Sequence, residues 1–130
     1  MNAIIAIAAG GALGALARHY VNIGVSMMAK IAFPFGTLSV NVLGCFCIGA
    51  LIAVFAHLWN PGQSIKLFLI TGFLGAFTTF STFSLDVMTL YSRGAYLAAG
   101  SYIGASVFLS LAGVFAGHFI VSYVLSLRGL

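Results

Sequence analysis

Residues 36–58 read GTLSVNVLGCFCIGALIAVFAHL and carry no formal charge. A helix needs about 20 predominantly apolar residues to cross the hydrocarbon core of a bilayer, so this stretch predicts a membrane-spanning helix. The composition of the whole chain agrees with it, because 62% of the 130 residues are hydrophobic and 5% are charged. Soluble domains have roughly 25% charged residues. We therefore expect lipid to cover most of the surface of this protein.

Three further stretches have similar length and polarity, at residues 3–28, 67–91 and 96–127. Together with the first, they predict an all-α integral membrane protein with four transmembrane helices. The connections between them are too short to hold a soluble domain. We therefore expect a single four-span membrane domain over residues 1–130.

The basic residues are scattered singly along the chain, whereas a nucleic-acid-binding surface needs clustered Lys and Arg. We therefore expect no nucleic-acid partner. Four spans place Lys66 and Arg128 on the side of the termini, and Lys30 and Arg93 on the opposite side. An excess of basic residues orients a membrane protein, and this chain has none on either side. It either inserts in both orientations, so that copies pair antiparallel, or balances its charges by chance.

The third apolar stretch contains an unusual segment, residues 71–84, which reads TGFLGAFTTFSTFS. Gly, Thr, Ser and Phe are mediocre or poor helix formers, so the segment predicts a broken helix, which a membrane tolerates only where protein or a cavity surrounds it. Carbonyl groups freed at such a break can coordinate a small cation. Phe77, Phe80 and Phe83 follow with a spacing of three, which packing alone also explains.

Polar residues lie on two of the other spans. Asn41 is either an amide donor in a pore or a hydrogen-bonding link between helices. Tyr102, Ser106 and Ser110 are spaced by four and share one face of a helix. Their hydroxyl groups can donate to an anion or bond their own backbone. The residue types leave both pairs of alternatives open.

Small residues on the spans suggest packing. Gly100 and Gly104 form a pair typical of close helix contacts in membranes. Cys45 and Cys47 are two residues apart, so on a helix they point to different faces and suit neither a shared metal nor a disulfide. We interpret both as buried small apolar side chains.

Ionisable residues are rare within the predicted spans. Arg18 either extends to the nearer interface or raises the concentration of anions at a pore mouth. Asp86 is the only acidic residue, and we expect it to pair with a hydroxyl or a basic group. The three histidines lie on different segments without ligand spacing and are assigned no role. No grouping of residues is typical of a catalytic site, so the sequence indicates that the protein is not an enzyme.

The segment GAFTTFSTFS, at residues 75–84, resembles the corresponding segment of the CrcB/Fluc fluoride channel family. The likeness covers the whole length of the chain. It includes residues 36–41 at the start of the second span, Arg18 in the first span, and the polar face of the fourth span.

This resemblance implies a passive, fluoride-selective channel that exports fluoride from the cytoplasm across the bacterial inner membrane and relieves fluoride toxicity. It implies an antiparallel, dual-topology homodimer with two fluoride pathways. It also implies a structural sodium ion at the centre of the dimer, held by the backbone carbonyl groups of Gly75 and Thr78.

The functional positions of the family can be carried over residue by residue. The pore positions fall on Asn41, Phe80, Phe83, Tyr102, Ser106 and Ser110, and the vestibule arginine falls on Arg18. The chain departs from the family pattern at Asp86, where many relatives have Glu, and at Ala76, where Gly-Gly is common. Neither departure changes a proposed ligand side chain, although Ala76 can alter the local backbone.

Two other functions remain open from the residues. A small proton-coupled multidrug-type exporter also has four spans and dual topology, but it needs a carboxylate in the first span, and residues 3–28 contain no acid. Asp86 would have to take that role. A non-transporting subunit of a larger membrane complex is the third interpretation.

Overall fold

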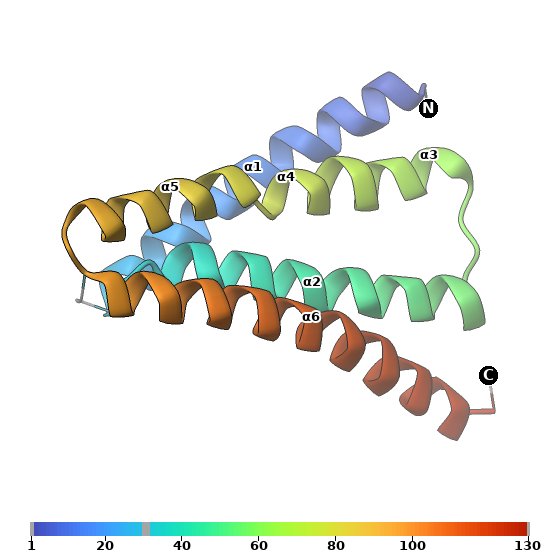
Figure 1. Cartoon of the computed structure of the whole chain (residues 1–130). Coiled ribbons are helices and arrows are strands. Elements are labelled where there is room, and N and C mark those ends of the chain that lie inside the picture. The colour runs from blue at the N-terminus through green and yellow to red at the C-terminus, as the bar shows by residue number, and fades with distance from the viewer. Residues whose placement is uncertain (1, 30–31, 130) are drawn as a thin grey trace.

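The computed structural model describes residues 2–29 and 32–129 and consists of helices joined by short turns (Figure 1). The helical segments are α1 (Ala3–Ala29), α2 (Phe35–His57), α3 (Gln63–Lys66), the π-helical segment η1 (Leu67–Leu74), α4 (Gly75–Phe77), α5 (Phe80–Ser92) and α6 (Tyr96–Leu127). Four helices are long and apolar enough to cross a membrane: α1, α2, the composite helix Gln63–Ser92, and α6. The prediction of an all-helical chain with four such helices is confirmed.

The third helix is interrupted, as predicted, between α4 and α5. Thr78 and Thr79 both have extended backbone conformations, with φ and ψ of −80° and 157° for Thr78, and −154° and 119° for Thr79. Thr79 caps α5, because its Oγ1 accepts a hydrogen bond from the backbone N–H of Thr82 at 3.2 Å. Such a cap satisfies one of the N–H groups that a helix N-terminus leaves without an intrahelical partner. The cap therefore starts a new helix directly after the break.

The third span begins four residues before the predicted boundary, because residues 63–66 form the helical turn α3. Its next eight residues are π-helical, a local distortion that often marks functional segments.

Glycines bring two pairs of helices into backbone contact. A Cβ atom on Gly10 or Gly14 of α1 would overlap with the backbone of η1, and one on Gly49 or Gly117 would overlap across the contact of α2 with α6. Small residues let membrane helices approach closely, which maximises van der Waals contact. The bundle is therefore built from two tight pairs, α1 with η1 and α2 with α6.

The expected contact at Gly100 and Gly104 is not made within the chain. Apart from the neighbouring turns of α6 itself, no described residue has an atom within 4 Å of a Cβ built on either glycine. The small-residue contact of α6 lies further along the helix instead, at Gly113 and Gly117, because α6 crosses α2 over that part of its length.

The two termini lie at the same end of the bundle as the connection between α2 and α3 (Figure 1). Lys66 and Arg128 belong to this end, and Arg93 belongs to the opposite end, in the turn between α5 and α6. Lys30 lies outside the described residues. The equal distribution of charge therefore stays a prediction.

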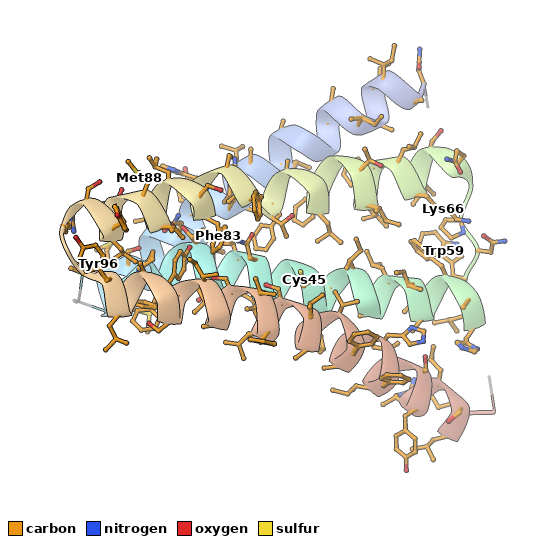
Figure 2. The ribbon with its side chains drawn as sticks, viewed as in Figure 1. Cys45, Trp59, Lys66, Phe83, Met88 and Tyr96 are labelled. Carbon is orange, nitrogen blue, oxygen red and sulfur yellow. The ribbon has the colours of Figure 1, made fainter. Side chains whose placement is uncertain are left out.

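Large apolar side chains project outward along all four spans, among them Met88 and Tyr96 (Figure 2). In water such a surface would drive aggregation, whereas hydrocarbon accommodates it. The buried cluster is small and lies between α5 and α6, where Phe83, Leu90 and Tyr102 pack together.

Candidate functional site

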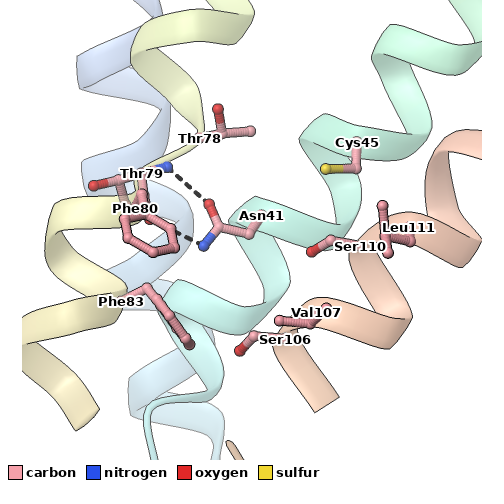
Figure 3. Close-up of a pocket in the computed structure, with 10 residues that line it drawn as sticks. All are labelled: Asn41, Cys45, Thr78, Thr79, Phe80, Phe83, Ser106, Val107, Ser110 and Leu111. Carbon is pink, nitrogen blue, oxygen red and sulfur yellow. Dashed lines mark hydrogen bonds between the residues drawn. The ribbon is translucent and has the colours of Figure 1, made fainter. Parts of the chain in front are cut away.

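The break in the third span is held open by the side chain of Asn41, which reaches it from α2. The Nδ2 group of Asn41 donates to the carbonyl oxygen of Thr79 at 3.1 Å, and the backbone N–H of Thr79 donates to Oδ1 of Asn41 at 2.7 Å (Figure 3). The amide side chain thus replaces the backbone partners that an unbroken helix would have provided. Of the two roles that the sequence left open for Asn41, the hydrogen-bonding link between helices is present.

Two carbonyl groups at the break have lost their helical donors. The N–H four residues after Gly75 belongs to Thr79 and donates to Asn41, and the N–H four residues after Thr78 belongs to Thr82 and donates to the side chain of Thr79. Gly75 is exposed and Thr78 is half-buried. Both oxygens therefore have lone pairs available, which is the chemistry that a small hard cation requires.

A cavity of about 330 Å³ opens beside the break, between α2, α5 and α6 (Figure 3). Its lining is Asn41, Cys45, Thr78, Thr79, Phe80, Phe83, Ser106, Val107, Ser110 and Leu111. The structure thus brings five of the six predicted pore residues together around one space. Among the described residues, this lining includes no carboxylate, so its polar groups are an amide, hydroxyls, a thiol and the backbone.

The two predicted pore phenylalanines differ in their surroundings. The ring of Phe80 is 78% exposed, whereas the ring of Phe83 is 8% exposed, and their centroids lie 5.3 Å apart at an interplanar angle of 45°. Phe77 is buried and stacks on Phe73, with centroids 6.1 Å apart. The evenly spaced phenylalanines therefore divide at the break, with Phe77 packed in the bundle and the other two at the cavity.

Tyr102, the sixth predicted pore residue, is fully buried beside the cavity and does not line it. Its hydroxyl donates to Oδ2 of Asp86 at 3.1 Å, so the expected hydroxyl partner of Asp86 is Tyr102. The hydroxyl groups of Ser106 and Thr37 lie near that of Tyr102. Even so, Oγ of Ser106 forms no hydrogen bond of normal geometry with any described residue.

Arg18 lies apart from this cavity. It is half-buried on α1 and lines a separate space of about 520 Å³ with His19, Asn22 and Thr82. Thr82 belongs to the first turn of α5, so this second space adjoins the helix that begins at the break. The structure therefore leaves Arg18 outside the group of predicted pore residues, but close to α5, the helix that carries Phe80 and Phe83.

A family model described as "CrcB-like protein, Camphor Resistance (CrcB)" matches residues 5–118. The chain belongs to the CrcB-like family. Curated relatives carry the name "Fluoride-specific ion channel FluC". One from Rhodospirillum centenum is 49% identical over 117 residues, which cover 90% of this chain and 93% of the relative.

Other members of the family are equally similar. A relative from Rhizobium etli is 50% identical over 111 residues, covering 85% of this chain and 89% of the relative, and one from Cereibacter sphaeroides is 50% identical over 117 residues, covering 90% and 92%. Both have the same channel name. With the four apolar helices, these relatives identify the chain as a multi-pass membrane protein.

Two residues at the site were missed by reasoning from the sequence. Thr79 provides both the backbone partner of Asn41 and the cap of α5, and the available signal was its residue type, because threonine is favoured at helix N-caps. Cys45 was interpreted, like Cys47, only as a buried apolar side chain, and this was wrong, because Cys45 is half-buried and Cys47 is exposed. Cys45 lies four residues after Asn41 on the same helix, and that spacing places both on one face.

Proposed function

We propose that this member of the CrcB-like family is a passive, fluoride-selective channel that exports fluoride from the cytoplasm across the bacterial inner membrane. The observation that carries the proposal is the cavity at the break, where hydrogen-bond donors and phenyl rings converge without an acidic group among the described lining residues. Fluoride is small and strongly hydrated, so a pore has to replace its water with other donors. The names of the relatives support the choice of ion.

The donors in the cavity have capacity left for an anion. An amide nitrogen carries two hydrogens, and only one of those on Asn41 is used in the bond to Thr79. The Ser106 hydroxyl is buried beside the hydroxyl of Tyr102 and forms no hydrogen bond of normal geometry among the described residues. The edge of a phenyl ring is electropositive, and Phe80 and Phe83 present their rings at the same cavity. These groups provide partial positive charge without a full charge that would trap the ion.

We further propose that the functional unit is an antiparallel, dual-topology homodimer. Backbone groups without hydrogen-bond partners do not face lipid, yet Gly75 at the break is exposed in the single chain. A second copy that covers the break would remove its backbone from lipid. The equal distribution of basic residues in the sequence is consistent with copies inserted in opposite orientations.

A structural sodium ion completes this proposal. Gly75 and Thr78 have carbonyl oxygens whose helical donors are bonded elsewhere, so the residues present fit a small hard cation. When bound, such an ion would neutralise the partial negative charge of these oxygens. The chain itself contributes the broken backbone that Asn41 and Thr79 hold in place.

The observations do not favour a proton-coupled exporter. The first span contains no acid, and the carboxylate of Asp86 accepts a hydrogen bond from Tyr102. The relatives are named as channels.

The test is fluoride efflux from proteoliposomes, measured with a fluoride electrode after a potassium ionophore removes the membrane potential. We expect rapid efflux that needs no proton gradient, while vesicles loaded with chloride and followed with a chloride electrode keep their contents. Absence of fluoride efflux from a well-folded preparation would overturn the proposal. Efflux that stops when the proton gradient is dissipated would indicate coupled transport instead.

A further inference from the structure

A third space lies at the end of the bundle opposite to the termini, beside the turn between α5 and α6 (Figure 1). Its volume is about 230 Å³, and its polar lining consists of Asp86, Thr89 and Arg93 from α5 and its C-cap, and Ser26 from α1. Arg93 is exposed, whereas Asp86 is half-buried. This Arg93 space therefore opens at the surface beside the arginine and reaches inward to the one acidic residue of the chain.

Tyr102 connects the Arg93 space to the cavity at the break. Its side chain has no exposed surface, and its hydroxyl donates to Oδ2 of Asp86 at 3.1 Å. The hydroxyl of Ser106, which lines the cavity at the break, lies near that of Tyr102. The ring of Phe33 lines the Arg93 space and packs edge-on against the ring of Tyr102, with centroids 5.6 Å apart. Tyr102 therefore lies between the two spaces, with Asp86 on one side and Ser106 on the other.

The carboxylate of Asp86 is an obstacle to an anion that leaves or enters through the Arg93 space. Acidic side chains line the pores of cation channels, whereas Arg and Lys line those of anion channels. The repulsion is stronger near protein than in bulk water, because the effective dielectric constant is lower. Arg93 follows Asp86 by seven residues, or two helical turns, so both project from one face of α5. The same space thus holds one negative and one positive side chain.

We propose that the Arg93 space is a mouth of the fluoride pathway, and that Arg93 makes this mouth passable to fluoride by offsetting the negative charge of Asp86. This inference rests on the proposed function. The guanidinium group stays charged in proteins, so the offset is permanent. A positive charge between walls of low dielectric constant also raises the local concentration of anions and their rate of entry. Arg93 acts through its charge and needs no bond of fixed geometry to the ion.

The experiment measures fluoride efflux from proteoliposomes for Arg93→Gln and Arg93→Lys. At an ionic strength of about 0.01 M, where the Debye length is about 30 Å, we expect Arg93→Gln to lower efflux at least about tenfold. The loss should shrink at about 1 M salt, because the Debye length falls to about 3 Å. Arg93→Lys keeps the charge and should conduct like the parent. Lys66→Gln, at the other end of the bundle, is the matched control and should conduct like the parent at both ionic strengths.

A double-mutant cycle with Asp86→Asn tests whether Arg93 acts against the carboxylate. Asparagine removes the charge, and its side-chain oxygen still accepts a hydrogen bond from Tyr102. With Asp86→Asn in place, Arg93→Gln should change efflux by less than about twofold, because neighbouring groups that act through each other are not additive. A merely structural role of Arg93 would predict the same loss in both backgrounds.

The outcomes separate this inference from the proposed function. Efflux of Arg93→Gln that equals that of the parent at low ionic strength overturns the inference and leaves the channel function standing. An equal loss in Arg93→Lys and Arg93→Gln, or a loss that salt does not change, also overturns it. Size-exclusion chromatography of each variant checks that the dimer is intact. If the parent carries no fluoride, the proposed function fails and this inference fails with it.

Discussion

Asn41 and Thr79 exchange two hydrogen bonds across the break in the third span, with N···O distances of 3.1 and 2.7 Å (Figure 3). The pair connects α2 to the point where α5 begins. Because Phe80 and Phe83 follow directly on α5, this connection sets where their rings lie relative to Ser106 and Ser110. One amide therefore both builds the break and lines the cavity beside it.

The first prediction separates these two tasks of Asn41. Asn41→Ala removes both hydrogen bonds, and bonds between membrane helices contribute about 0.6 to 1.7 kcal/mol each. We expect a loss of roughly 1 to 3 kcal/mol in the free energy of unfolding, together with loss of fluoride efflux. The control is Ser110→Ala, which removes a cavity hydroxyl and leaves the break intact, so it should lower efflux with little change in stability. Reversible unfolding in mixed micelles measures the difference, and equal stability of the two variants would contradict this role of Asn41.

The second prediction concerns the phenylalanines on either side of the break. Replacing Phe80 or Phe83 by Ile conserves much of the apolar volume but removes the electropositive ring edge. We expect both variants to form a folded dimer with severely reduced fluoride efflux. Phe77→Ile is the matched control, because its ring stacks on Phe73 away from the cavity, and it should lose less than about 1.5 kcal/mol of stability and keep most efflux. Near-normal efflux through both cavity variants would show that these rings do not contact the ion.

The third prediction concerns the hydrogen bond between Tyr102 and Asp86. Tyr102→Phe leaves a partly buried carboxylate without its donor, which should cost about 1 to 3 kcal/mol in the free energy of unfolding. In a double-mutant cycle with Asp86→Ala, the second substitution should cost much less once the first is present, giving a coupling energy of about 0.5 to 3 kcal/mol. Tyr91→Phe, at an exposed position, serves as the control and should change nothing. Strictly additive effects of the two substitutions would rule out the interaction.

The fourth prediction tests coordination of a cation by the backbone of the break. Among the described residues, a Cβ on Gly75 would meet the carbonyl oxygen of Ile70 alone, at the ordinary distance of 3.5 Å, so the single chain leaves space for a Cβ at this position. We nevertheless expect Gly75→Val to abolish efflux, because the valine side chain would crowd the second copy of the chain that we propose lies against the break. Thr78→Ala removes the hydroxyl that donates to Leu74 at 3.0 Å but leaves the carbonyl, and it should retain more efflux than Gly75→Val.

The cation itself can be removed. Exchange of sodium for N-methyl-D-glucamine should lower the melting temperature of the parent dimer and leave that of Gly75→Val unchanged. The reverse order of efflux in the two variants, or a parent dimer insensitive to sodium, counts against the carbonyl site.

The fifth prediction concerns orientation in the membrane. In a variant that lacks Cys45 and Cys47, a single cysteine placed at the C-terminus should react with an impermeant maleimide from both sides of the membrane in comparable amounts. The reason is the equal number of basic residues expected on the two sides. A cysteine introduced in the turn after Arg93, at the opposite end of the bundle, should give the same result. Labelling from one side alone would exclude the antiparallel dimer.

The positions of the spans followed from the sequence, because hydrocarbon demands about 20 apolar residues in each crossing. The interruption of the third span was also predictable, since residues 71–84 are poor helix formers. Its location was not, because it depends on which residue meets the side chain of Asn41. Only the fold decided that Thr79, 38 residues away, is that partner.

The meaning of individual side chains was decided in the same way. The sequence alone determined that Phe77, Phe80 and Phe83 recur at regular spacing, but the break turns the last two toward the cavity and leaves the first in the packing. The sequence also left Cys45 and Cys47 equivalent, whereas the structure places Cys45 at the cavity beside α6 and Cys47 in an apolar groove between α2 and η1. The physical reason is that each helix that crosses a bilayer must itself be apolar. This requirement can be read from the sequence of that helix alone. The contacts between helices depend instead on close approach at glycines such as Gly14 and Gly117, and these contacts exist only in three dimensions.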